Sequence, residues 1–182
     1  EVQQSIDLAQ QERQGLAALE KTYDLYIDAI DYRGIALLLR ARSDANSLNQ
    51  VSRKKKVIDK KLRHLLELDA NLPESSRLDI NPLLTSWNDL HILMPATQGG
   101  PEILFLHFNN FVSQTKNLLE HIIYNSQLIH DPDSATLLLV NLMNGALPDA
   151  LTNIGRARAM GTYALAVSAI DTHTFNELDR LY

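Results

Sequence analysis

The sequence predicts an all-α protein built as two stacked four-helix bundles that share long helices. Apolar residues recur at alternating steps of three and four through most of the chain, which is the period of an amphipathic helix. Proline and glycine gather in a few short segments, so the helices between them are long. With 182 residues, of which 45% are apolar, the chain can bury a substantial core.

The first half of the chain predicts three helices, at 2–42, 47–68 and 82–93. The first helix would be about 60 Å long at 1.5 Å per residue. It ends before the polar segment 43–46. The segment 69–79 contains Pro73 and several cap-forming residues, so it is expected to be a loop. Pro82 suits the first turn of the third helix.

The second half predicts three further helices, at 102–129, at 134–168 and from Asp171 to the end. Two prolines and two glycines within 94–101 predict an interruption of the helical pattern before the fourth helix. Asp131-Pro132-Asp133-Ser134 forms a turn and an N-cap before the fifth helix. Pro148 is expected to kink that helix. The sixth helix is short, which suggests a truncated last element.

The lengths of these helices predict how they stack. Short connections make successive helices antiparallel neighbours. The first and fourth helices would span the full height, the second and third the far half, and the fifth and sixth the near half. This gives one domain, 1–182, with a distal bundle of roughly 25–115 and a proximal bundle of roughly 1–24 plus 116–182.

Composition and motifs argue against several functional classes. The chain has no cysteine, its six histidines are scattered, and no helical metal-binding motif is present. No phosphate-binding loop and no serine-centred nucleophile motif appears. An acidic overall charge of −5 and the absence of a recognisable motif argue against nucleic acid. We therefore expect no catalytic residue, no metal site and no cofactor.

A basic region interrupts the acidic chain. Nine basic residues and two acidic ones lie between Arg40 and Arg63. Two interpretations are open: these residues form only the solvated face of a helix, or their positive field raises the encounter rate with small anions.

Two arginines lie on the apolar seam of the first helix. Arg33 and Arg40 share the inward register of its apolar residues, which are Leu16, Leu19, Tyr23, Tyr26, Ile30 and Leu37. A buried arginine without a partner costs several kcal/mol. Either an internal carboxylate such as Asp89 or Glu102 pairs with these arginines, they extend outward from the seam's edge, or an external anion binds them.

Antiparallel alignment of the first and fourth helices predicts the surroundings of this first candidate site. It places Arg33 opposite 111–115 and Arg40 opposite 104–108, so that Thr115 adds a hydroxyl. A second candidate group lies on the fifth helix, where Arg158 flanks the seam and Thr162 and Tyr163 follow one turn later. The alternative for Arg158 is a surface position, which is the usual place of an arginine at a helix flank.

The chain resembles the helical bimodular family of extracytoplasmic sensor domains of bacterial chemoreceptors and histidine kinases. The residues that carry the resemblance are Tyr32-Arg33-Gly34 with Ile35 to Arg40, Asp131-Pro132-Asp133, Leu147-Pro148, and Gly155-Arg156-Ala157-Arg158-Ala159-Met160-Gly161. Many such domains carry two tyrosines after the DPD turn, where this chain has Ala135, Thr136 and Leu137.

The resemblance implies a function. Members of the family bind small carboxylates within one or both bundles, act as dimers and signal through the membrane. We therefore expect a periplasmic sensor domain of an inner-membrane receptor, which binds a small anion and is flanked by membrane spans before Glu1 and beyond Tyr182. The alternative is a helical interaction module that reads a periplasmic binding protein or a partner helix without a small ligand.

Overall fold

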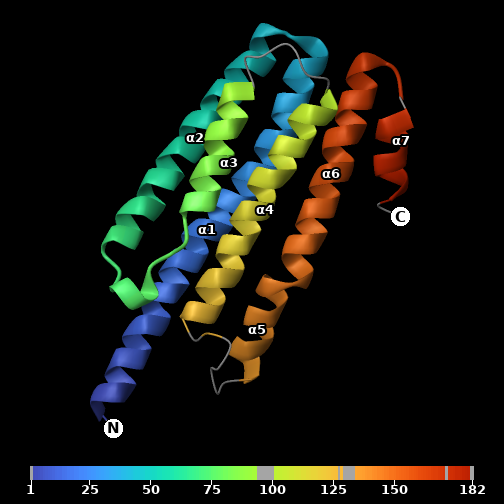
Figure 1. The fold of residues 1–182 in the computed structure, drawn as a ribbon. Helices are drawn as coiled ribbons and strands as arrows, with labels where there is room; N and C mark the ends of the chain where they lie inside the picture. Colours follow the sequence, from blue (N-terminus) through green and yellow to red (C-terminus); the bar gives the residue numbers. More distant parts are fainter. Residues whose placement is uncertain (1, 94–100, 127, 129–133, 171, 181–182) are drawn as a thin grey trace.

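A computed structural model describes the chain except for residues 1, 94–100, 127, 129–133, 171 and 181–182 (Figure 1). Within the described residues every regular element is helical, which confirms the all-α prediction. The elements are α1 Val2–Arg42, α2 Ala45–Ala70, the short 3-10 helix η1 Glu74–Ser76, α3 Asn81–Leu93, α4 Pro101–Asn125, α5 Ser134–Asn144, α6 Ala146–Val167 and α7 Thr172–Asp179. No described helix is long and apolar enough to cross a membrane.

The turn between α1 and α2 follows from its polar residues. Ser43 adopts a left-handed conformation with φ of 51°, which ends α1. Asp44 then caps α2, because its carboxylate accepts a hydrogen bond of 2.8 Å from the backbone N–H of Ser47. The predicted break at 43–46 is therefore correct to within two residues.

The predicted fifth helix is divided in two. The structure places a break at Gly145, between α5 and α6. Pro148 lies in the first turn of α6, where the missing N–H removes no intrahelical bond. The helix is thus interrupted as Pro148 predicts, because the break at Gly145 lies between Pro148 and Asn144, the residue whose carbonyl the proline ring would meet in a continuous helix.

Helix α1 is the centre of the bundle. Helices α2, α4 and α6 each pack along it, and α3 packs on α4 (Figure 1). The stacked arrangement is not confirmed, because α6 lies beside the same part of α1 as α2 does. Arg158 of α6 and Lys54 of α2 both bond to Asp31 of α1. The stacked arrangement was predicted from the lengths of the connections alone. These lengths do not show which sides of α1 are apolar, and so they do not show which helices pack on it. The bounds of the two bundles stay a prediction.

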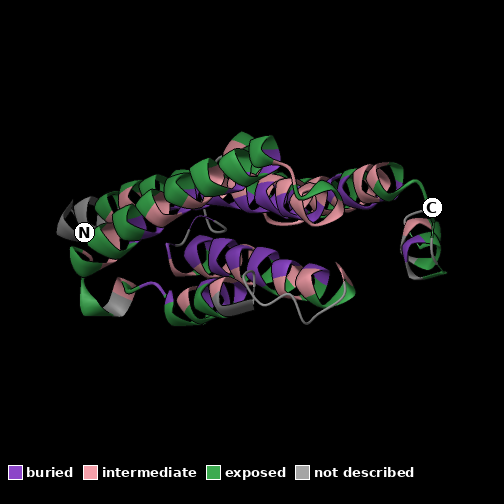
Figure 2. Cartoon of the chain, turned by 90° about the horizontal axis from the view of Figure 1, so that it is seen from above, coloured by how far each residue is buried: buried purple, intermediate pink, exposed green. Residues whose placement is uncertain are grey.

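The buried residues line the inner faces of the helices, as Figure 2 shows from above. Aromatic rings form the middle of the main core: the Trp87 ring centroid lies 5.6 Å from that of Tyr32 and 4.8 Å from that of Phe111. The His91 ring packs against Trp87 at 4.2 Å. A smaller cluster joins α1, α4 and α6 and consists of Leu37, Phe105, Ala159 and Met160.

Candidate anion-binding site

A close contact between α1 and α6 positions the candidate site. A Cβ atom on Gly155 would collide with Cγ2 of Ile30 and would lie 3.0 Å from Nη2 of Arg33. Only a glycine lets the two helices approach this closely. The hydroxyl of Tyr26 fixes the contact, because it donates a 2.7 Å hydrogen bond to the carbonyl of Pro148 and also meets the hydroxyl of Thr152.

Arg33 lies in this contact and is fully buried, with 0% of its surface exposed. Its Nη1 donates to Oδ1 of Asn109 on α4 at 2.7 Å, and its Nη2 donates to the backbone carbonyl of Thr152 on α6 at 3.1 Å. The guanidinium carbon lies 5.5 Å from the centroid of the Phe105 ring. Its Nε has no hydrogen-bond partner among the residues that the structure describes. The guanidinium therefore joins three helices through neutral acceptors.

The positive charge of Arg33 has no counter-charge within the described part of the chain. Neither Asp89 nor Glu102 pairs with it, so the internal salt bridge that the sequence left open is absent there. Desolvation by burial, together with repulsion from Arg156 and Arg158, lowers the pKa of Arg33 from 12.5 to about 10. The group remains protonated at neutral pH, and its charge is buried at a cost.

Arg158 closes the outer side of the same contact. Its Nη2 lies 2.5 Å from Oδ1 of Asp31, and its side chain is 54% exposed. The same nitrogen lies 3.9 Å from the point that a Cβ of Gly34 would occupy, so Arg158 covers the backbone next to Arg33. Asp31 is also 3.5 Å from Nζ of Lys54. The acidic residue nearest in sequence to Arg33 is thus held by two other cations.

The structure brings Arg33 and Arg158 to the same contact but not the other predicted site residues. The register predicted between α1 and α4 was wrong by about one turn, because Asn109 rather than a residue of 111–115 faces Arg33. The hydroxyl of Thr115 is buried and donates to the carbonyl of Phe111, so it offers no free donor.

The remaining predicted residues have other surroundings. Arg40 is half-buried seven residues beyond Arg33 on α1, and it makes an interaction there. Tyr163 packs against the smaller cluster and also has an interaction partner. Thr162 is half-exposed.

Four residues of the site were missed from the sequence. Asn109 and Phe105 belong to α4 and became neighbours of Arg33 only through the helix register. Thr152 acts through its backbone carbonyl, which no side-chain pattern reveals. Gly155 offered a signal, because a glycine inside a helix often marks a close approach of two backbones.

The basic region of α2 is divided between two environments. Nζ of Lys54 lies 2.8 Å from Oδ1 of Asp28, and Nζ of Lys61 lies 2.7 Å from Oδ2 of the same residue. These two lysines therefore bind α2 to α1. Other cations of the region are exposed, among them Arg53, Lys56, Lys60 and Arg63.

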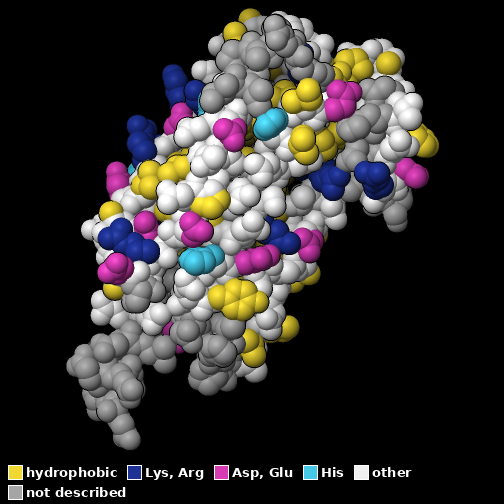
Figure 3. All heavy atoms as spheres, in the orientation of Figure 1, with side chains coloured by type: hydrophobic (Ala, Val, Ile, Leu, Met, Phe, Trp, Pro, Cys, Tyr) yellow, Lys and Arg dark blue, Asp and Glu magenta, His cyan; other side chains and the backbone are white. Residues whose placement is uncertain are grey.

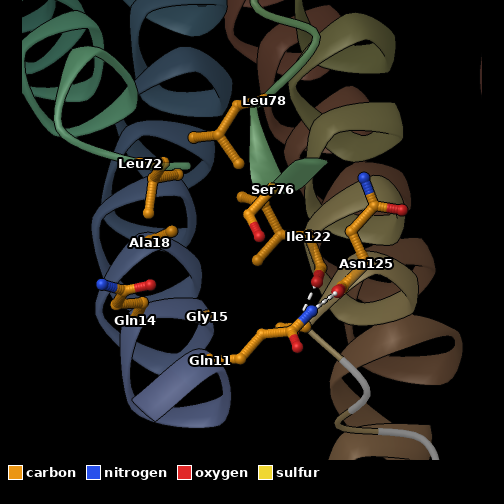
Figure 4. Close-up of a pocket in the computed structure, with 10 residues that line it drawn as sticks. Gln11, Gln14, Gly15, Ala18, Leu72, Ser76, Leu78, Ile122 and Asn125 are labelled. Atoms are coloured by element: carbon orange, nitrogen blue, oxygen red, sulfur yellow. Dashed lines mark hydrogen bonds between the residues drawn. The ribbon is translucent and has the colours of Figure 1, made fainter. Parts of the chain in front are cut away.

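A separate cavity lies between the N-terminal half of α1 and the C-terminal end of α4, near η1 (Figure 4). Gln11 reaches across it and donates a 2.8 Å hydrogen bond to the carbonyl of Asn125. Gly15 permits this approach, because a Cβ there would collide with Ser126. The cavity measures about 20 Å³, which is room for a single water molecule. It does not accommodate an organic acid in this conformation.

Comparisons of the chain with protein-family models, with curated proteins and with solved structures found no match.

Proposed function

We propose that the chain is the ligand-sensing domain of a bacterial transmembrane receptor, a chemoreceptor or a sensor kinase, and that it binds a small organic acid at Arg33. The observation that carries this proposal is a fully buried guanidinium whose described partners are all neutral. The resemblance to helical bimodular sensor domains supports the receptor context, with the domain in the periplasm and the receptor anchored in the inner membrane.

The electrostatics of the α1–α6 contact favour an anion. Arg156 and Arg158 repel the charge of Arg33, and of these two Arg158 is already paired with Asp31. A carboxylate would relieve this repulsion and would supply the missing counter-charge. The unbonded Nε and the adjacent Nη2 of Arg33 form one edge of the guanidinium fork, the geometry that a carboxylate accepts through two parallel bonds.

Binding would require movement of α6. Because Arg33 is fully buried, an anion reaches it only if α6 shifts away from α1 or α4. The contacts that such a shift breaks are the bond from Arg33 to the Thr152 carbonyl and the exposed pair of Arg158 with Asp31. A ligand that replaces these contacts would couple its binding to the position of α6, which is what a sensor requires.

Thermal shift and calorimetry with a panel of organic acids test this proposal. Acetate, lactate, succinate and citrate are added at matched ionic strength, with sodium chloride as the reference. An acid at 100 times its dissociation constant should stabilise the fold by about 2.7 kcal/mol. Arg33→Met should abolish the stabilisation, whereas Arg13→Met, an exposed arginine of the same helix, should leave it intact.

Two results would contradict the proposal. If no acid stabilises the wild-type protein beyond chloride, the anion-sensing function is rejected. If an acid stabilises Arg33→Met as much as the wild type, sensing survives, but the site lies elsewhere.

A second candidate function is a helical interaction module that reads a partner helix, a periplasmic binding protein or a second copy of the chain. It is favoured by large apolar side chains on the outer side of α5 and α6: Leu138 is 73% exposed, Ile154 67% and Leu165 81%. Ile154 and Leu165 are eleven residues apart, so they lie on the same side of α6, and exposed apolar residues that share a side suit an interaction surface.

Sedimentation equilibrium distinguishes the candidates. Self-association that Ile154→Glu and Leu165→Glu abolish, and that no organic acid changes, would favour the interaction module. A protein that stays monomeric at high concentration, with and without acids, would count against the homodimer.

A further inference from the structure

The outer face of α2 carries a row of cations that the fold does not use. Arg53, Lys56, Lys60 and Arg63 follow one another at steps of three, four and three residues, so they lie along one side of the helix. All four are exposed, and none pairs with an acidic residue within the described part of the chain. Figure 3 shows basic side chains along the edge of the molecule that α2 occupies.

This row borders an apolar groove between α2 and α3. The groove has a volume of about 490 Å³. Lys56 and Arg63 stand on its rim, and its other lining residues are Asp59, Leu62, Leu66, Leu84 and Trp87. Leu66 is 40% exposed, so part of the apolar lining is open to solvent. A groove with apolar walls and a cationic rim differs from an ordinary solvated helix face, which carries charges without a cavity beneath them.

The one acidic residue of the groove is already engaged. Oδ1 of Asp59 accepts a 2.9 Å hydrogen bond from the indole Nε1 of Trp87. This bond ties α2 to α3 at the floor of the groove. The indole is neutral and leaves the charge of Asp59 in place, so two cations face one carboxylate among the described lining residues, and the groove favours negative charge.

We propose that this groove binds an acidic amphipathic helix of a partner protein. The row from Arg53 to Arg63 extends about 15 Å along the axis, which is longer than one small anion can neutralise. Arg53 and Lys60 are seven residues apart, as are Lys56 and Arg63. A helix lying alongside α2 repeats with nearly the same seven-residue period, so its glutamates would meet these cations while its leucines fill the groove.

The probe is a synthetic 21-residue peptide of three heptads, with leucine at the first and fourth positions and glutamate beside them. Its composition in scrambled order serves as the control peptide. Binding is measured by the anisotropy of a fluorescein on the peptide and by the emission of Trp87, the single tryptophan of the chain. The amphipathic peptide should bind and shift the Trp87 emission, and the scrambled peptide should bind at least about tenfold more weakly.

Charge reversal identifies the surface. Lys56→Glu with Arg63→Glu should weaken peptide binding by at least about tenfold, and a peptide with lysine in place of glutamate should restore binding to this variant. Arg13→Glu with Lys21→Glu changes the net charge equally on exposed positions of α1 and should leave binding within about twofold. Circular dichroism melts establish that each variant is folded.

Several outcomes would overturn the proposal. Equal binding of the scrambled peptide, or equal loss in the α1 variant, would mean that the cations act only through net charge. Tighter binding of anionic phospholipid vesicles or of a DNA oligonucleotide than of the peptide would assign the row to another class of partner. An unchanged affinity in the Lys56 and Arg63 variant would exclude the groove.

Discussion

Two sides of α1 differ in how their charged side chains are paired. Toward α2, the carboxylates of Asp24, Asp28 and Asp31 repeat at helical spacing and meet Lys54 and Lys61. Toward α6, Arg33 is fully buried, and among the described residues it meets only an amide oxygen, a backbone carbonyl and an aromatic ring. The first side has its charges balanced, whereas the second carries an uncompensated cation.

This difference indicates which contact of α1 would gain free energy from a bound anion and which would not. A balanced contact gains nothing from an added anion, because each lysine already has its carboxylate. An unbalanced contact retains the cost of desolvating a charge, and any anion that enters recovers part of that cost. The two sides should therefore respond differently to the same kinds of substitution.

The largest effect is expected from Asp28→Asn. Its carboxylate is 13% exposed and bonds to Lys54 and Lys61 at once, so the substitution removes two charge-assisted bonds. We expect a loss of about 2–3 kcal/mol in the free energy of unfolding, measured by urea denaturation. Asp24→Asn is the matched control: that carboxylate is 65% exposed and 3.9 Å from Lys61, and its loss should cost about 0.5 kcal/mol or less.

The pH dependence of unfolding sharpens this prediction. Desolvation opposes ionisation of Asp28, but the hydrogen bonds from Lys54 and Lys61 prevail and lower its pKa below 3.8. Its stabilising contribution is therefore present above pH 3.8 and is lost as the pH falls through the lower folded-state pKa. Acid titration of the wild type should show this loss, and Asp28→Asn should flatten it. Identical curves for both proteins would mean that the Asp28 carboxylate does not hold α2 to α1.

The next effect is expected from Gly155→Ala on the unbalanced side. The added methyl group would collide with Ile30 and press on Arg33, so α6 must move outward. Overpacking of this kind costs about 1–3 kcal/mol. Gly161→Ala, where nothing lies within 4 Å of the new Cβ, should be neutral or stabilising by up to about 1 kcal/mol. Equal effects of the two substitutions on the melting temperature would contradict the close contact.

A smaller effect is expected from Arg33→Met without ligand. The substitution strands no carboxylate, keeps an apolar stem in the core and removes a buried charge, so stability should change by about 1 kcal/mol or less. Differential scanning calorimetry checks it. A destabilisation as large as that of Asp28→Asn would make Arg33 a structural residue and withdraw it from the proposed site.

Apart from the control substitutions, the smallest effect is expected from Asp31→Asn. This carboxylate is 36% exposed and pairs with Arg158, which is 54% exposed. Exposed pairs contribute about 1 kcal/mol or less. Urea denaturation at low and at high salt should show a small loss that salt reduces. If Asp31→Asn lowered the free energy of unfolding more than Asp28→Asn, then Asp31 rather than Asp28 would be the main stabilising carboxylate of α1.

The sequence predicted the helices and the inward position of Arg33, because a 3.6-residue period identifies both. It did not predict the partners of Arg33. Asn109 faces it only through a register that differs by one turn from the expected one, and Thr152 contributes a backbone atom. The place of α6 was missed for a similar reason. The spacing of apolar residues in α1 shows that this helix is buried. It does not show which of its sides packs against which helix.

The contacts of α1 join residues that are close in the sequence on one side and far apart on the other. This difference has a consequence for folding kinetics. Lys54 and Asp28 are 26 positions apart, whereas Arg33 and Thr152 are 119 apart and Tyr26 and Thr152 are 126 apart. Closing a long loop costs conformational entropy before the native contacts compensate for it, and this slows folding. The α1–α2 hairpin should therefore form early, and α6 should dock last. The segment that arrives last covers the uncompensated arginine, so the amide hydrogens of α6 should exchange with solvent sooner than those of α2.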